Sequence, residues 1–353
     1  MNSKARVKAA FSGEGYDRLP MWYGAEPGTT ENTCKFMGVN SEEELMRTLG
    51  IDFRTIRPRY IGPHLERYPD GSFDTYWGIR RGGGFWGIPL NTPLQHAQSI
   101  KDVEKHKFPE VEWFDVEFNE EDKRLSKDYY IIGGMWAPFW HETGDLLGFE
   151  KMLVDLYLNP ALVDAVIERT FQFNYEVTHK AFEANKGLID MFWFANDFGS
   201  QDGLLLDPKL WRKFFKPRIK KLSELGHRYN MTVAMHSCGD IHEIIPDLIE
   251  IGIEVINPIQ PTAANMDLAT LKSEYGKDII FFGAIDVTEI LNHGTEQQVR
   301  DETRRVIDLL GYDGKYIVAP SHDLMMEEIP PRNIWAMYDE GKKYSLSLRS
   351  KQT

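Results

Sequence analysis

Short apolar runs alternate with longer amphipathic segments along most of this 353-residue chain. The short runs are rich in β-branched and aromatic residues and are bounded by Gly, Pro, Asn or Asp, a pattern typical of buried strands. The pattern predicts strands over 19–24, 52–58, 129–136, 189–196, 231–238, 253–259, 278–286 and 315–322.

The amphipathic segments carry signals for the beginning and end of helices. Two of them open at Asn159 and Asp207, each followed directly by a proline, which is the usual order of an N-cap and a first helical turn. Two others end at glycine, where a C-cap is expected. The helices predicted from these signals cover 159–185, 207–230, 241–252 and 295–314.

The order of these elements points to a parallel sheet. From residue 187 onward strands and helices alternate with short connections, as right-handed crossovers require. Eight strand candidates in one chain favour a closed (β/α)8 TIM barrel over an open sheet. The region 59–128 breaks this alternation because it is rich in Gly, Trp and charge. We therefore expect one domain over 1–353, with 59–128 as a capping insertion of loops and short antiparallel strands after the second strand.

Composition and charge narrow the class of protein. Hydrophobic residues make up 42% of the chain and charged residues 27%, as in soluble globular proteins. The formal net charge of −13 argues against nucleic acid as a partner. No apolar run reaches the length of a membrane span, and the N-terminal residues lack a secretory signal. Cys34 and Cys238 give no disulfide framework, so a cytoplasmic location is expected.

Side chains suited to binding or catalysis recur at one end of the predicted strands. Active sites of (β/α)8 barrels lie where strands end and the next loops begin. The residues at that position are Glu26, Arg57, Trp136, Asn196, Asp197, Gln201, His236, Cys238, Asn257, Gln260, Asp286, His322 and Asp323. A barrel without a site needs no such ring, so we expect the site among them.

His236 and Cys238 form a candidate metal-binding pair. They are two residues apart in an extended segment, so both side chains point to the same face. Imidazole and thiolate donors suit zinc, and a third ligand is expected from His322, with Asp197 as the second choice. The alternative is structural, because a buried cysteine often acts as a small hydrophobic residue and a histidine as a satisfied polar group.

Asp197, in the segment "FANDFGSQDG", also has two interpretations. Aspartate is common after a strand as a turn or helix-capping residue. In a catalytic site the same carboxylate would anchor a substrate group or transfer a proton to it.

Together these segments resemble the uroporphyrinogen decarboxylase superfamily, in particular its cobalamin-dependent methyltransferases. The resemblance runs almost from end to end of the chain. It rests on "RVKAAFSGEGYDRLPMW", "NDFGSQDG", "HSCGDIHEIIPDLIEIGIEVINPIQ", "LKSEYGKDIIFFGAID" and "APSHDLMMEEIPPRNIWAMYDE". It implies a (β/α)8 barrel whose active cleft lies at the carboxyl ends of the strands, and it is compatible with a homodimer.

Two departures from the family pattern change the expected reaction. The porphyrinogen decarboxylases bind substrate carboxylates through an arginine-rich N-terminal motif, whereas this chain has "MWYGAEPGTTE" there, with two glutamates and no arginine. The methyltransferases bind zinc through His-x-Cys and a distant cysteine, whereas this chain reads "VAPSHDL" at the distant position. The resemblance then leaves His236, Cys238 and His322 as the expected zinc ligands.

A zinc ion with one thiolate ligand fewer is a stronger Lewis acid, which suits removal of a methyl group from an ether. We expect a methyltransferase that passes the methyl group of a small donor, with methoxylated aromatics favoured, to the cobalamin of a corrinoid protein. Asp197 and His322 are the expected catalytic residues. The expected substrate-binding residues are Glu26, Trp136, Trp193, Phe198, Gln201, Asn257, Gln260 and Asp286.

Two rival functions remain open from the sequence. A metal-free lyase or decarboxylase of the same superfamily, acting on a non-porphyrin substrate, would use Asp197 and His322 as acid and base. A non-catalytic barrel that binds a corrinoid or another ligand is the third alternative, although the ring of polar strand ends argues against it.

Overall fold

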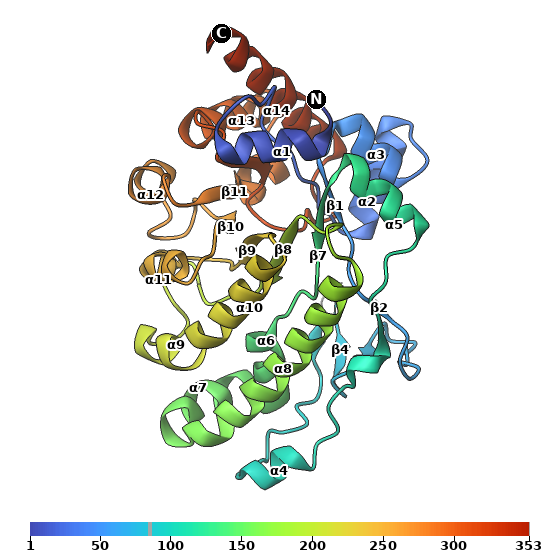
Figure 1. The fold of residues 1–353 in the computed structure, drawn as a ribbon, viewed down its shortest axis with the longest axis vertical. Coiled ribbons are helices and arrows are strands. Elements are labelled where there is room, and N and C mark those ends of the chain that lie inside the picture. The colour runs from blue at the N-terminus through green and yellow to red at the C-terminus, as the bar shows by residue number, and fades with distance from the viewer. Residues whose placement is uncertain (84–86, 353) are drawn as a thin grey trace.

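A curled parallel sheet of seven strands forms the centre of the molecule (Figure 1). The computed structural model describes residues 1–83 and 87–352. The strand order is β1-β7-β8-β9-β10-β11-β12, so strands that follow one another along the chain are neighbours. Their bounds are Phe53–Thr55, Tyr130–Gly133, Met191–Ala195, Thr232–His236, Val255–Ile259, Ile280–Ile285 and Tyr316–Pro320. Each lies inside a run that the sequence predicts as a strand.

The segment predicted as the first strand lies between the two edge strands of this sheet. Met21 forms an isolated parallel bridge with Val318 of β12, and its carbonyl accepts a hydrogen bond of 2.9 Å from the backbone of Asp52, beside β1. The backbone N–H of Met21 donates to the Asp52 carboxylate at 2.9 Å rather than to a strand. The Asp52 carboxylate thus accepts the N–H that a backbone carbonyl of a neighbouring strand would otherwise accept. For this reason the segment forms an isolated bridge instead of a regular strand. The arrangement is consistent with a TIM-like barrel.

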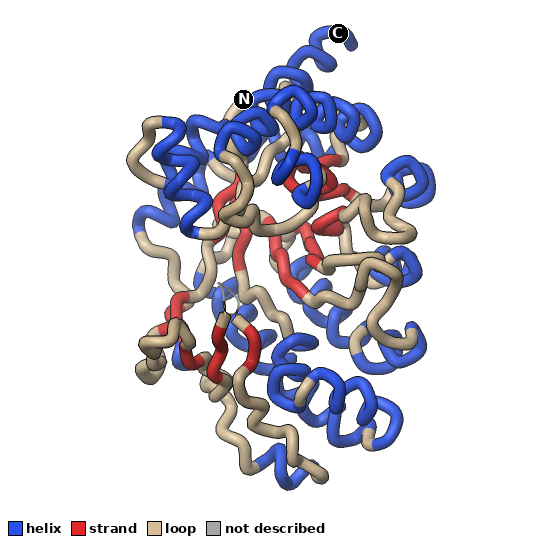
Figure 2. The backbone as a smooth tube through the Cα atoms, turned by 180° about the vertical axis from the view of Figure 1, so that it is seen from behind, coloured by secondary structure: helices blue, strands red, loops and turns tan. Residues whose placement is uncertain are grey.

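Helices lie around the strands (Figure 2). Within the described residues no helix has the length and apolar character needed to cross a membrane. Of the two predicted N-caps, Asp207 is confirmed and accepts from the backbone of Lys209, whereas Asn159 precedes α8 without a capping hydrogen bond from its side chain. Thr295 forms a capping box with Gln298. The main helices are α1 Ser3–Ser12, α2 Pro27–Met37, α3 Glu42–Leu49, α5 Glu120–Asp128, α6 Phe139–Leu147, α7 Phe149–Leu158, α8 Pro160–Ala184, α12 Leu268–Tyr275, α13 Glu296–Leu310 and α14 Pro331–Gln352.

The single helix predicted over 207–230 is two helices in the structure. They are α9, Pro208–Phe214, and α10, Lys216–Arg228. Pro217 has no backbone N–H to donate to the preceding turn, so the helix is interrupted just before it. The segment 241–252 is likewise divided, into a 3-10 turn over His242–Ile244 and α11 over Ile245–Glu250.

Aromatic side chains fill the interior enclosed by the strands. Trp193 of β8 lies edge-on to Trp22, with ring centroids 5.2 Å apart, and 5.3 Å from the ring of Phe282 on β11. The strands from β7 to β12 are buried on both faces, which explains why their sequences are apolar throughout rather than alternating.

The insertion contains the expected short antiparallel strands. β2 (Arg59–Tyr60) pairs with β6 (Phe114–Asp115), and a three-stranded sheet consists of β3 (Phe73–Asp74), β4 (Arg80–Gly82) and β5 (Ile88–Pro89). Helix α4, Ile100–Glu104, completes it beside α8 (Figure 1).

Part of the insertion packs against the helices after β7, while α5 at its end contacts α1 and β7. Trp77 Nε1 donates to Glu142 of α6 at 2.9 Å, and the side chain of Asn185, at the end of α8, accepts from the backbone of Phe118. A position over the mouth of the barrel remains a prediction.

Candidate metal centre

The loops after β8 and β9 bring together an oxygen, a nitrogen and a sulfur donor. Asp197 follows β8, His236 ends β9, and Cys238 comes two residues later. Asp197 Oδ1 is 3.2 Å from His236 Nε2, and Cys238 Sγ is 3.5 Å from the same nitrogen. One ligand atom from each of the three residues lies within 4.8 Å of the others. Such a donor set matches that of zinc sites in proteins.

Backbone contacts between the two loops hold this arrangement. The N–H of Cys238 donates to Asp197 Oδ1 at 2.8 Å, so the carboxylate is tied to the strand that carries the thiol. Gly239 has φ +79°, and a Cβ there would lie 2.5 Å from the carbonyl oxygen of Ser200. Only glycine therefore allows the two loops to approach so closely.

A neighbouring strand sets the orientation of the His236 ring. Its Nδ1 lies 2.8 Å from the side-chain oxygen of Asn257 on β10. An amide oxygen only accepts, which places a proton on Nδ1 and makes Nε2 the nitrogen that faces Asp197 and Cys238. Metal-binding histidines are commonly oriented by such a bond from the second ring nitrogen.

The charges of the site act on one another strongly. Burial favours the neutral form of Asp197, but His236 and His141 outweigh it and hold the pKa of this carboxyl well below its usual range. Burial likewise raises the pKa of the Cys238 thiol, but the charge of His236 reverses the effect and the net pKa is lowered. Both shifts act in the direction that metal binding requires. For His236, in contrast, burial is outweighed by the charges of Asp323, Cys238 and Asp197, which hold its pKa well above its usual value, so a metal would have to displace the Nε2 proton.

His322, the expected third ligand, contacts both its own loop and Cys238. Its Nδ1 lies 2.9 Å from the carbonyl of Leu324 and 3.3 Å from the carboxylate of Asp323. Burial alone would lower the pKa of His322, but a hydrogen bond with Cys238 and the charge of Asp323 raise it to about 9. The three-donor group found among the described residues contains Asp197 rather than His322.

His141 is a site residue that the sequence does not reveal. It lies on α6, and its Nε2 is 3.2 Å from Asp197 Oδ2, so the carboxylate bridges two histidines. The available signal is weak: "PFWHETG" begins shortly after β7, so its helix starts at the same end of the sheet as the other site residues.

Two of the expected aromatic residues border the cluster and one does not. The ring of Trp136 is 5.3 Å from that of His236 and 4.8 Å from that of Trp193. Phe198 is fully buried between Trp211 and Phe215, with ring centroids 5.9 and 5.2 Å away. Its ring therefore packs in the core among helices.

The other expected substrate-binding residues have mainly supporting positions. Gln260 accepts a hydrogen bond from the backbone of Gly239 at 2.8 Å, next to Cys238. Asp286 caps the short helix Val287–Leu291. Gln201 is exposed, and Glu26 is the N-cap residue of α2.

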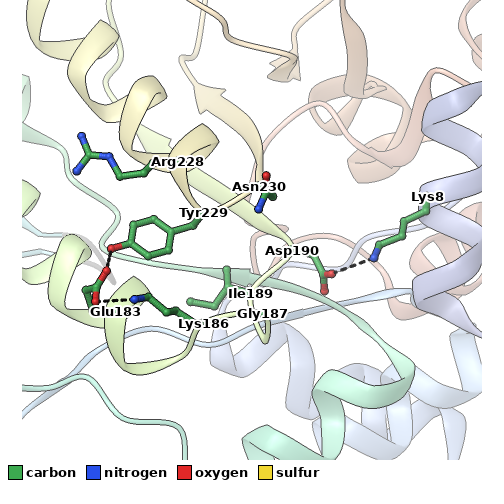
Figure 3. Close-up of a pocket in the computed structure, with 9 residues that line it drawn as sticks. All are labelled: Lys8, Glu183, Lys186, Gly187, Ile189, Asp190, Arg228, Tyr229 and Asn230. Carbon is green, nitrogen blue, oxygen red and sulfur yellow. Dashed lines mark hydrogen bonds and ion pairs between the residues drawn. The ribbon is translucent and has the colours of Figure 1, made fainter.

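A cavity of about 520 Å³ lies at the other end of the strands (Figure 3). Asp190 and Asn230, which precede β8 and β9, are in its wall, and Lys8 of α1 forms an ion pair with Asp190 across it. The remaining lining residues are Glu183, Lys186, Gly187, Ile189, Arg228 and Tyr229. The amino ends of barrel strands usually serve stability, so this cavity is separate from the candidate site.

Comparisons with known proteins agree with this architecture. A methyltransferase from Methanosarcina mazei of known structure superposes with a TM-score of 0.64 at 18% sequence identity, covering 98% of this chain and 99% of that chain. At this identity the likeness concerns the fold.

Two curated proteins are similar in sequence. The methylated-thiol–coenzyme M methyltransferase of Methanosarcina mazei is 24% identical over 185 residues, which are 52% of this chain and 47% of that protein. The methylcobamide:CoM methyltransferase MtbA of Methanosarcina acetivorans is 22% identical over 225 residues, 63% of this chain and 60% of that protein. The chain thus spans about half to three fifths of the lengths of these relatives. The uroporphyrinogen decarboxylase (URO-D) family model matches residues 91–344, and the chain belongs to that family.

Proposed function

We propose that this protein is a zinc-dependent methyltransferase that moves a methyl group from a small methylated donor to a corrinoid protein. The observation that carries the proposal is the convergence of Asp197, His236 and Cys238 at the carboxyl ends of β8 and β9. The names of the curated relatives support it, because both are methyltransferases and one acts on a methylcobamide.

The protein groups divide into ligands and supporting residues. Zinc would be held by His236 Nε2, Cys238 Sγ and a carboxylate oxygen of Asp197, and when bound it supplies a Lewis acid for the atom that carries the methyl group. Asn257 keeps the His236 ring in place, and His141 does the same for Asp197. His322, in contact with Cys238, is the residue placed to give a proton to the leaving oxygen.

The donor set favours an ether over a thiol as the reacting group. A single thiolate ligand transfers less charge to a metal than two, so the centre remains electrophilic. An electrophilic centre polarises an ether oxygen, which otherwise leaves poorly. Trp136 borders the cluster, is partly accessible and can contact an aromatic ring, and the buried Trp193 packs against it. Methoxylated aromatics are therefore the proposed donors.

A metal-free lyase or decarboxylase is the alternative, and its acid and base would be His322 and Asp197. The hydrogen-bonded Asp197–His236 pair favours it, because such a pair can transfer protons without a metal. Zinc analysis of the purified protein separates the two functions.

The decisive experiment combines the protein, a reduced corrinoid protein and candidate methyl ethers, and follows the absorption change of cobalt methylation. We expect methylation with the wild type and the Cys34→Ala variant, whose altered cysteine lies in α2, and none with Cys238→Ala. Zinc should be stoichiometric in the first two proteins and lost in the third. Stable absorbance with every donor would exclude the methyltransferase.

A further inference from the structure

Arg57, in the loop after β1, is a guanidinium without an acidic partner. Its Nη1 donates to the backbone carbonyls of Gly134, directly after β7, and Trp193, within β8, at 3.0 and 2.9 Å. No carboxylate among the described side chains forms a hydrogen bond or an ion pair with it. The Nε and Nη2 groups have no hydrogen-bond partner within the described chain.

The other enclosed arginines are all neutralised. Arg18 pairs with Asp52, Arg54 with Glu43, and Arg218 with Asp164 and Glu168. Arg57 is only partly accessible to solvent, so the lack of a counter-ion is costly, and two carbonyl dipoles offset only part of that cost. Burial lowers the pKa of Arg57 to about 9, so the group is still charged at neutral pH. The protein therefore presents an unbalanced positive charge at this position.

The guanidinium of Arg57 and the imidazole of His236 both lie beside the indole ring of Trp136. Arg57 Cζ is 5.1 Å from the ring centre of Trp136, whose ring is 5.3 Å from that of His236. Arg57, Trp136 and Cys238 are all partly accessible to solvent. The site is thus polarised, with carboxylates around His236 at one end and a lone cation at the other.

We propose that Arg57 binds a carboxylate of the substrate, so that the methyl donor is a methoxylated aromatic acid. A carboxylate accepts two parallel hydrogen bonds from a guanidinium edge, and the Nε–Nη2 edge of Arg57 is the one without protein partners. An aromatic ring joining carboxylate and ether would lie along Trp136, with its methoxy group toward Cys238 and His236. This inference rests on the proposed function for the identity of the reacting group.

A purely structural role for Arg57 makes a different prediction. If Arg57 only links β7 to β8, it needs Nη1 alone, and its replacement would not change the binding of an anion. Binding of an anion is thus the measurement that separates the two roles, and it needs neither a corrinoid nor turnover.

Binding is tested with benzoate, with its neutral analogue benzyl alcohol, and with inorganic phosphate, by calorimetry and thermal unfolding of the full chain. We expect benzoate to bind the wild type and to raise its Tm, and benzyl alcohol and phosphate to bind at least tenfold more weakly. Arg57→Met should lose at least tenfold in benzoate affinity. The control Arg59→Met, which alters an exposed arginine paired with Asp115, should retain it.

Arg57→Lys keeps the charge, loses the planar edge and serves if the methionine variant does not fold; its benzoate affinity should also fall about tenfold. Unchanged benzoate affinity in the folded Arg57 variants would overturn the proposal, and so would phosphate binding more tightly than benzoate.

Methyl transfer from 4-methoxybenzoate and 4-methoxybenzyl alcohol distinguishes this inference from the proposed function. If both donors are demethylated and Arg57→Lys has the same KM for each of them as the wild type, the proposed methyltransferase is supported and the carboxylate site is excluded. Benzoate binding that depends on Arg57, without methyl transfer from any ether, would do the opposite. If both proposals hold, Arg57→Lys raises KM for the acid about tenfold and leaves KM for the alcohol unchanged.

Discussion

Asp197 Oδ1 lies 3.2 Å from His236 Nε2 and, at the same time, accepts a hydrogen bond from the backbone N–H of Cys238. One carboxylate oxygen is thus in contact with both members of the His-x-Cys pair. This makes Asp197, rather than His322, the residue to examine first as the third metal ligand.

Replacing Asp197 should weaken zinc binding more than replacing His322. We expect Asp197→Ala to lower zinc affinity by more than the ~100-fold reached by losing a supporting contact, because a direct donor is removed. His322→Ala should retain stoichiometric zinc after dialysis, because His322 is not in the three-donor group of the described residues. Chelator competition measures both affinities. The opposite ranking would return His322 to the ligand set.

Asn257 should act on the metal through His236. Asn257→Leu preserves the volume and removes the acceptor for the Nδ1 proton, so the ring loses its fixed orientation. A loss of about 10–100-fold in zinc affinity is expected, with little change in the far-ultraviolet circular dichroism. Unaltered affinity would mean that packing alone orients the ring.

Gly239→Ala should displace Cys238. The added methyl group would meet the backbone of Ser200 at 2.5 Å, in addition to the strain of a left-handed backbone. The control Gly38→Ala has a similar φ of +69° and no atom within 4 Å of the new Cβ, so it carries the strain alone, about 1 kcal/mol. We expect Gly239→Ala to lose zinc and the control to keep it. Equal zinc contents would show that the loops can separate without cost.

The buried carboxyl of Glu142 should make stability depend on pH. Burial raises its pKa from 4.5 to about 8, although Trp77 and Asn174 donate hydrogen bonds to it. Between those values the folded protein binds more protons than the unfolded chain, so the free energy of unfolding falls as pH rises. The stabilisation that comes from protonated Glu142 is complete below the unfolded pKa of 4.5. It is lost as the pH rises through the folded pKa of about 8.

The slope of the unfolding free energy with pH is at most ~1.4 kcal/mol per pH unit, and Glu142→Gln should remove it. Urea unfolding of zinc-free protein from pH 5 to 9 measures it, as the difference between wild type and variant. The exposed Glu117→Gln is the control. Parallel curves for wild type and Glu142→Gln would place the carboxyl in its ionised form throughout.

Short apolar runs predicted the seven strands of the sheet, and alternation predicted half of the candidate site, because both are local properties of the chain; the eighth predicted strand, 19–24, forms only a bridge. Alternation in an extended segment places His236 and Cys238 on one face, and both lie in the three-donor cluster. Asp197 reaches them through a loop whose path depends on Gly239, and His141 reaches them from a helix. Strand periodicity specifies neither path, so sequence reasoning ranked Asp197 second and did not identify His141.

The contact of the amino-terminal segment 19–24 with the edge strands β1 and β12 depends on one carboxylate, that of Asp52. Asp52 is wholly enclosed and takes hydrogen bonds from Met21, Arg18 and Arg6, in place of a continuous ladder between neighbouring strands. Amide protons in such a contact exchange through local opening sooner than those in a regular ladder. Local opening of the molecule would accordingly start between β1 and β12, where the segment 19–24 is held by Asp52, rather than within the continuous ladder that contains β8 and β9.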